Sequence, residues 1–331
     1  MRAAMVQQFG GPEQLRLERQ PDPTPGAGEV LLAVEAAGVN RADLLIRAGQ
    51  YHRAAQPPLR LGVEGAGTVV ALGTGVTDVA VGQRVVAMGP VNEPGFYAEL
   101  AVVAAARVTP VPDGVALTTA AALPTAWLSA WYCLRTLAEL RAGETVLIPA
   151  AASGVGSAAV RIAVDAGATV IGTARSAAKA DWVRALGAQH ALDTATLDSA
   201  GLLAEVARLT GGRGVEVVLD TVGGQTFADG LRAVGYAGRV VALANVAVAP
   251  STVDTRDFYP KNVRILGFQL TNLIEHGYDP RPDLTALLDA VAAGRFEVPV
   301  DVVFPLAEAA EAHRYLERRA NRGKVLLSTG A

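Results

Sequence analysis

The chain has 331 residues, of which 51% are hydrophobic and only 18% are charged, so it can fill two ordinary cores and we expect two domains. The formal net charge of −3 argues against nucleic acid as the main partner, because phosphate binding needs a basic face. The single cysteine, Cys133, excludes an intrachain disulfide and a four-cysteine zinc site. Residues 1–14 lack the apolar core of a signal peptide, so we expect a cytoplasmic protein.

Short apolar runs separated by Gly, Pro and Asp make up the first part of the chain, which is typical of a β-barrel or sandwich. Between them, residues 38–51 favour a helix with Asn40 as its cap. Residues 114–134 carry no charge, but Pro124 interrupts them, so we expect a buried helix over 117–137 and no membrane span. Strands are predicted at 1–9, 15–19, 29–37, 67–72, 84–88 and 97–103.

From Thr145 the pattern changes to alternating strands and helices, which predicts a doubly wound parallel sheet. The tail from about residue 270 holds helix and strand signals that fit neither end of that sheet, so we expect the chain to return to the first domain. The predicted domains are therefore 1–122, 123–268 and a returning segment 269–331. The sheet strands are predicted at 145–149, 168–172, 190–192, 215–220, 238–244 and 263–268, and the tail strands at 298–304 and 324–327.

A turn of small residues joins the first strand of the predicted sheet to a helix at 157–166. Such a turn lets a pyrophosphate approach the backbone, and the helix N-terminus offers it unpaired N–H groups. The pattern is not G-x-G-x-x-G, and an ordinary Ala/Gly-rich helix start is the alternative; the flanking strand and helix favour a dinucleotide site. The candidate cofactor-binding residues here are Ala151, Ala152, Ser153, Gly154, Val155 and Gly156.

The end of the second sheet strand indicates which dinucleotide binds. An NAD site usually carries an acid there for the ribose 2′-hydroxyl, whereas this chain has Arg175, Ser176 and Lys179, with no acid before Asp181. The two cations and the hydroxyl would attract a 2′-phosphate. The sequence therefore predicts NADPH in preference to NADH, the alternative being that both cations are solvated surface.

The whole chain resembles the medium-chain dehydrogenase/reductase superfamily, in its zinc-independent NADPH:quinone oxidoreductase branch. The resemblance implies a GroES-like substrate domain and a Rossmann domain with the site in the cleft between them, and a homodimer that pairs the strand near 263–268. The motifs that carry it are FGGPE (9–13), GVNRADLLIRAGQY (38–51), GVEGAGTVVALGTGV (62–76), GQRV (82–85), AASGVG (151–156), GGRGVEVVLDTVGG (211–224) and GKVLL (323–327).

The residues at the zinc positions of this superfamily predict no metal. Zinc-dependent members carry a Cys where this chain has Asn40 and a His where it has Val63. Neither Asn nor Val is a useful zinc ligand. Without a metal, hydride must pass from the nicotinamide to an electrophile that is already activated. The protein then supplies orientation and a dry stacking pocket, with a proton from the protein as a further option.

The resemblance implies that Asn40 and Tyr51 lie near nicotinamide and substrate as the candidate catalytic residues. A tyrosine hydroxyl is a neutral donor at neutral pH, so Tyr51 either protonates the substrate oxygen or only shapes the pocket. Asn40 is also placed among the cofactor contacts. Matching adds Ser129, Thr221, Leu243, Ala244, Asn245, Phe268 and Arg322, the last with a surface arginine as an equal alternative.

The expected substrate is a small-molecule quinone. The alternatives are an NADPH-dependent reductase of the double bond of an enone, alkenal or enoyl thioester, and a non-catalytic NADPH-binding protein. A coenzyme A thioester would need a basic rim, and the substrate half shows no obvious Lys/Arg cluster. We expect the loops at 52–59 and 90–96 to set the shape of the pocket.

Overall fold

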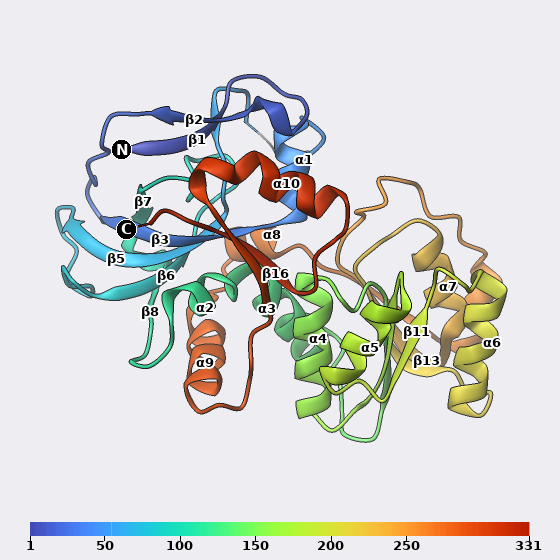
Figure 1. Cartoon of the computed structure of the whole chain (residues 1–331). Helices are drawn as coiled ribbons and strands as arrows, with labels where there is room; N and C mark the ends of the chain where they lie inside the picture. The colour runs from blue at the N-terminus through green and yellow to red at the C-terminus, as the bar shows by residue number, and fades with distance from the viewer. Residues whose placement is uncertain (54, 331) are drawn as a thin grey trace. The chain divides into compact units, whose positions relative to one another are not determined.

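A computed structural model describes residues 1–53 and 55–330 of the chain. The chain divides into two compact units (Figure 1). Unit 1 holds Met1–Leu128 and Tyr278–Ala331, and unit 2 holds Ser129–Gly277. The chain returns to its first unit after Gly277, whereas the boundaries expected from the sequence were residues 122 and 268.

Unit 1 is built on a seven-stranded sheet in the order β15-β16-β3-β5-β6-β8, with β7 paired to β3. A three-stranded sheet, β2-β1-β4, accompanies it. The long strand β3 alternates buried and half-buried residues over its first half, as expected of a strand with one face on a core. The strands are β1 (Arg2–Val6), β2 (Leu15–Arg19), β3 (Glu29–Val39), β4 (Leu59–Arg60), β5 (Glu64–Leu72), β6 (Arg84–Met88), β7 (Leu100–Ala104), β8 (Val108–Pro110), β15 (Val300–Pro305) and β16 (Lys324–Ser328).

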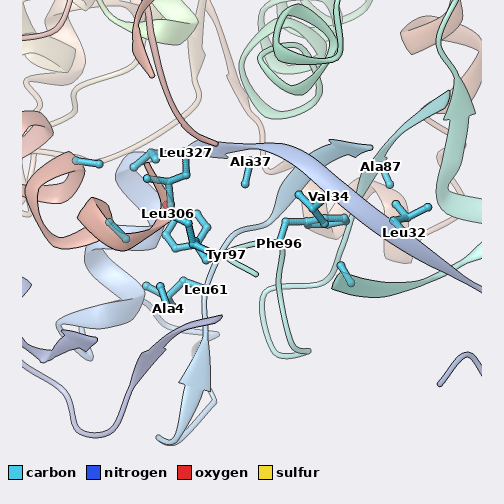
Figure 2. Close-up of a cluster of buried hydrophobic side chains, with 14 of the residues drawn as sticks. Ala4, Leu32, Val34, Ala37, Leu61, Ala87, Phe96, Tyr97, Leu306 and Leu327 are labelled. Carbon is cyan, nitrogen blue, oxygen red and sulfur yellow. The ribbon is translucent and has the colours of Figure 1, made fainter. Parts of the chain in front are cut away.

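The core of unit 1 lies between these strands and the helices of the same unit. Figure 2 shows Leu32 and Val34 of β3, Leu327 of β16 and the ring of Tyr97 in one apolar cluster. Tyr97 is fully buried, so its hydroxyl needs a partner inside the protein. The helices of unit 1 are α1 (Arg41–Arg47), α2 (Leu117–Ala121), α3 (Pro124–Trp131, which runs into unit 2), α9 (Arg281–Ala292) and α10 (Ala309–Glu317).

The single buried helix predicted over 117–137 is three consecutive helical segments. Pro124 is the first residue of α3, where its missing N–H and fixed φ are tolerated. The last segment, Tyr132–Leu137, is a π-helix. The apolar pattern located the buried stretch correctly, and the proline divides it. No helix within the part of the chain that the structure describes is long and apolar enough to cross a membrane.

Unit 2 is a parallel six-stranded sheet in the order β11-β10-β9-β12-β13-β14. Its central strands are buried along nearly their whole length, which is typical of parallel strands covered on both faces. In Figure 1, α4 and α5 lie against β9–β11, and α7 packs on β12 and β13. The elements are β9 (Thr145–Ile148), α4 (Gly154–Asp165), β10 (Thr169–Ala174), α5 (Ala177–Ala185), β11 (His190–Asp193), α6 (Ser199–Thr210), β12 (Val215–Asp220), α7 (Gln225–Ala233), β13 (Val234–Ala242), β14 (Arg264–Gly267) and α8 (Leu270–Glu275).

Candidate functional site

The turn after β9 has the local structure of a dinucleotide-binding turn. The helix begins at Gly154 and not at residue 157, because the Ser153 hydroxyl caps it by accepting from Gly156 N at 3.0 Å. A Cβ at Gly156 would lie 2.3 Å from the carbonyl oxygen of Ala150, so only glycine lets the helix start this close to the turn. The first N–H groups of a helix have no partner within it, and here they belong to Gly154 and Val155.

The predicted cofactor residues of unit 2 follow the carboxyl ends of neighbouring strands, and hydrogen bonds link these ends in turn. Ala151 N donates to Thr173 O of β10 at 2.8 Å, and Thr221 Oγ1 donates to Pro149 O at 3.3 Å. Leu243 N donates to the last carbonyl of β12 at 2.9 Å, and Phe268 N donates to the last carbonyl of β13 at 3.0 Å. The structure therefore brings these turns to one edge of the sheet, the usual ligand edge of such folds.

Asp220, the last residue of β12, holds the loop that follows this strand at the ligand edge. Its carboxylate accepts from the backbone N–H groups of Val222 at 3.1 Å and Gly223 at 3.0 Å. Burial raises the pKa of Asp220 to about 6, and the two N–H donors partly oppose that rise. The bonds hold the loop that carries Thr221, which is itself buried.

The end of β10 fits a phosphate better than a hydroxyl. Arg175 is exposed directly after the strand, and Ser176 is the N-cap of α5, with its hydroxyl accepting from Lys179 N at 3.3 Å. The first acid, Asp181, is ion-paired with Arg184 in the same helix. The residues present therefore fit NADPH, since a cationic side chain and a helix N-terminus surround the position where the 2′-phosphate is expected.

Asn40 is held in unit 1 by two oppositely charged side chains. In the antiparallel register, Val39 pairs with Val325 and Ala37 with Gly65, which sets Asn40, Lys324 and Glu64 at the same end of three adjacent strands. Lys324 Nζ donates to Asn40 Oδ1 at 2.8 Å and to Glu64 Oε1 at 2.6 Å. Asn40 Nδ2 donates to Glu64 Oε1 at 2.7 Å.

The cluster of Asn40, Lys324 and Glu64 is enclosed by the fold. The Lys324 and Glu64 side chains are 3% and 0% exposed. The second carboxylate oxygen, Oε2, accepts from Thr125 N at 2.6 Å, in the first turn of α3. A Cβ at Gly38 would lie 2.1 Å from Glu64 Oε1, so β3 has a glycine where the carboxylate crosses it. Neither Lys324 nor Glu64 is predicted as a site residue from the sequence. The one available signal was a lone charge in each of two apolar strand motifs.

A second buried polar cluster lies beyond α1. Asp43 Oδ2 accepts from Asn40 N at 2.8 Å, which caps the helix, and from the Tyr97 hydroxyl at 3.3 Å. The same hydroxyl lies 3.3 Å from His313 Nε2, and Arg47 Nη1 lies 3.1 Å from His313 Nδ1. Burial raises the pKa of Asp43 to about 7, against the opposing bond from Asn40 N. Burial, with help from the Arg47 cation, lowers the pKa of His313 to about 3.

The remaining predicted residues are placed as follows. Tyr51, after α1, is half-buried against the unit 1 core, with its ring 4.8 Å from that of His52. Ser129 is buried in α3. Arg322 is exposed, and its backbone N donates to Asp301 at 3.1 Å. Among the residues that the structure describes, no group of three or more His, Cys, Asp or Glu side chains is arranged to hold a metal.

Comparisons with known proteins agree with a two-unit oxidoreductase. Residues 26–113 match the family model "Alcohol dehydrogenase GroES-like domain", and residues 154–292 match "Zinc-binding dehydrogenase". The chain is 32% identical to the synaptic vesicle membrane protein VAT-1 homolog of Rattus norvegicus, covering 100% of this chain and 84% of that protein. It is 34% identical over 304 residues to a mycocerosic acid synthase-like polyketide synthase of Mycobacterium tuberculosis, covering 92% of this chain but spanning only 14% of that protein.

Solved structures show the same fold over the whole chain. The Escherichia coli quinone oxidoreductase complexed with NADPH matches with a TM-score of 0.91 at 30% identity, covering 99% of this chain and 100% of the other. An NAD-dependent alcohol dehydrogenase also matches with a TM-score of 0.91, at 32% identity and 100% of both chains. The chain belongs to the medium-chain dehydrogenase/reductase superfamily, in its zinc-independent branch. It is an oxidoreductase with a GroES-like domain and a Rossmann domain.

Proposed function

We propose that this chain transfers hydride from NADPH to a quinone. Superfamily membership gives reductase chemistry with NADPH as the cofactor; the quinone is the part proposed here. When bound, NADPH supplies two electrons and one hydrogen as hydride. The balanced reaction takes NADPH, a proton and a quinone to NADP⁺ and a hydroquinone, so the site must also deliver one proton.

The observation that carries this proposal is the environment of Asn40. By the family resemblance, Asn40 stands where zinc-dependent members have a Cys. Its carbonyl oxygen accepts a bond from the Lys324 ammonium at 2.8 Å. A metal cation at this oxygen would be repelled by that ammonium, and Val63, at the other position, has no ligand atom. The acceptor therefore has to be activated already, as a quinone is.

Within this proposal, the chain's residues divide the work between cofactor and substrate. The N–H groups of Gly154 and Val155 bind the pyrophosphate, and Arg175, Ser176 and Lys179 bind the 2′-phosphate. Ala151, Ala152, Ser153, Gly156, Ser129, Thr221, Leu243, Ala244, Asn245, Phe268 and Arg322 line the rest of the cofactor, with Asn40 beside the nicotinamide. Tyr51 donates the proton. A cytoplasmic location belongs to the same proposal.

Reduction of an activated double bond is the second candidate function. The similarity to one segment of a polyketide synthase favours it, and an enone or enoyl thioester also presents a carbonyl oxygen next to the reacting carbon. In that case hydride adds to the β-carbon, and the electron pair moves to the carbonyl oxygen before a proton is taken up. The two candidates need the same donors in the site and differ in the acceptor.

A panel of acceptors tests the proposal. NADPH oxidation is followed by absorbance with 1,4-benzoquinone, an ortho-quinone, a simple enone, an alkenal and a crotonyl thioester. We expect turnover on the quinones, and Tyr51→Phe should lower kcat about 100-fold, the size of effect expected when a general acid is removed. Tyr259→Phe, at an exposed tyrosine of unit 2, is the matched control.

The outcomes of the panel are distinct. Turnover on the enone or thioester alone would refute quinone reduction and make the protein a double-bond reductase. Binding of NADPH with no turnover on any acceptor would favour a non-catalytic binding protein. A Tyr51→Phe variant with raised KM but unchanged kcat would make Tyr51 a wall of the pocket and not a donor.

We also propose that the chain is a homodimer that pairs β14 across a two-fold axis. β14 is an edge strand of the parallel sheet and is exposed over most of its length, and Ile265 is 42% exposed. Unpaired strand edges with apolar side chains readily pair with a second copy. Ile265→Lys should halve the mass measured by light scattering, whereas Val81→Lys, at an exposed loop valine of unit 1, should not. A single-chain mass for the unaltered protein would refute the dimer.

A further inference from the structure

The orientation of the Asn40 amide is dictated by its two partners. A lysine ammonium can only donate and a carboxylate can only accept, so Oδ1 must face Lys324 and Nδ2 must face Glu64. Both partners are buried and paired to each other at 2.6 Å. Flipping the amide would place Nδ2 against an ammonium and Oδ1 against a carboxylate. The side chain therefore has one orientation.

We infer that Lys324 and Glu64 are positioning residues that present Asn40 as a hydrogen-bond donor to the carbonyl oxygen of the acceptor. Nδ2 carries two hydrogens, and Glu64 takes one of them. The other is the hydrogen that a ligand can use. This inference rests on the proposed function, and it narrows the substrate class to acceptors with an oxygen on the reacting group.

The Lys324 ammonium also strengthens that donor. A positive charge hydrogen-bonded to the amide oxygen draws electron density from the amide nitrogen, and linked hydrogen bonds polarise one another in a buried setting. During reduction, the electron pair moves onto the acceptor oxygen, which then takes a proton from Tyr51 or from water. A fixed donor aimed at the oxygen where negative charge develops lowers the barrier without reorganisation.

Stability alone does not explain the buried pair. Replacing a buried ion pair by apolar residues of similar volume is often neutral or stabilising. Here Gly38 leaves room for the Glu64 carboxylate, and Thr125 N donates a hydrogen bond to its second oxygen. The group that gains a single orientation from this arrangement is the side-chain amide of Asn40.

A double-mutant cycle tests the inference. Asn40→Asp keeps the shape but leaves no donor for a ligand, and we expect kcat with 1,4-benzoquinone to fall about 100-fold, as for loss of one oxyanion donor. The charge-balanced variant Glu64→Gln/Lys324→Met removes the orientation and the polarisation, and kcat should fall about 10-fold. In that background, Asn40→Asp should cause only about a further 10-fold loss, because the residues act as one unit. Each kcat is measured at saturating NADPH, so that a change in cofactor affinity at Asn40 does not enter the comparison.

Arg47→Met is the matched control. Arg47 is another buried cation of unit 1, and its guanidinium contacts Gly10 O, His313 and Glu317 instead of Asn40. In the Arg47→Met background, Asn40→Asp should still lower kcat about 100-fold, since independent sites add. Strict additivity between Asn40→Asp and Glu64→Gln/Lys324→Met would overturn the inference, because the pair would then act only on stability.

A readout that needs no turnover separates this inference from the proposed function. The side-chain NH₂ signals of Asn40 in the ¹⁵N spectrum are identified by their loss in Asn40→Asp. They should move toward the positions of exposed asparagines in Glu64→Gln/Lys324→Met. Unmoved signals would overturn the fixed orientation. Moved signals with silence on every acceptor would refute the proposed function, and with it the assigned ligand of Asn40, while the orientation would stand.

Discussion

Arg175→Asp is expected to weaken NADPH binding about 100-fold while changing NADH binding little, because the change replaces an attraction for the 2′-phosphate by a repulsion. Arg175 is exposed directly after β10, Ser176 is the N-cap of α5, and Lys179 lies in the first turn of that helix. NADH has no 2′-phosphate and therefore loses no ion pair. Fluorescence titration with both cofactors measures the two affinities.

Arg213→Asp is the control for this prediction. Arg213 is an exposed arginine of the same unit, but it precedes β12 and so lies at the amino end of a strand, opposite to the ligand edge. The Arg213→Asp variant makes the same change in net charge and should leave the affinities for NADPH and NADH unchanged. Equal weakening of both cofactors by Arg175→Asp, or an unaltered protein that prefers NADH, would contradict the assignment. This test matters because one similar solved structure is complexed with NADPH and another is an NAD-dependent alcohol dehydrogenase.

The fold of unit 2 was predictable because its signals are local. The strand, small-residue turn and helix at β9–α4 follow one another in the sequence, and the parallel sheet brings the turns to one edge. Local sequence patterns did not predict the helix boundaries that depend on side-chain hydrogen bonds, or very short helices. The helix starts at Gly154 because Ser153 turns its hydroxyl back to cap it, and the short helix α8 carries too few residues for a periodic signal.

The arrangement around Asn40 could not be predicted, since it depends on the pairing of distant strands. Lys324 is 260 residues from Glu64 along the chain, and the pairing of β16 with β3 and of β3 with β5 brings them together. A resemblance to a family places Asn40 near the substrate but says nothing of which atom faces it. His313 likewise has no local signal; the fold of α10 onto the unit 1 core buries it.

Asp43→Asn and His313→Gln are expected to change the pH dependence of stability in opposite directions. The folded-state pKa of Asp43 is raised to about 7 from 3.8, so between these values the folded protein binds more protons than the unfolded chain. The free energy of unfolding therefore falls as pH rises through this window. The folded-state pKa of His313 is lowered to about 3 from 6.5, so there the unfolded chain binds more protons and the free energy of unfolding rises with pH.

The two contributions oppose each other between about pH 4 and pH 6.5, and each spans on the order of 4 kcal/mol. Asp43→Asn leaves the His313 contribution, so stability should rise with pH relative to the unaltered protein. His313→Gln leaves the Asp43 contribution, so stability should fall. The charges facing the pair are Arg47 on the His313 side and Glu64 and Lys324 on the Asp43 side, and Tyr97 lies between them; the variants retain all four.

Urea unfolding at several pH values between 4 and 8 measures these differences. Asp220, whose pKa burial also raises, to about 6, contributes with the same sign as Asp43 but is common to every variant, so it cancels when each variant is compared with the unaltered protein. The double variant Asp43→Asn/His313→Gln removes both contributions and should give a nearly constant difference. If the single variants also gave differences that do not change with pH, neither buried group would titrate between its folded and unfolded values, and the opposing effects of the two groups would be disproved.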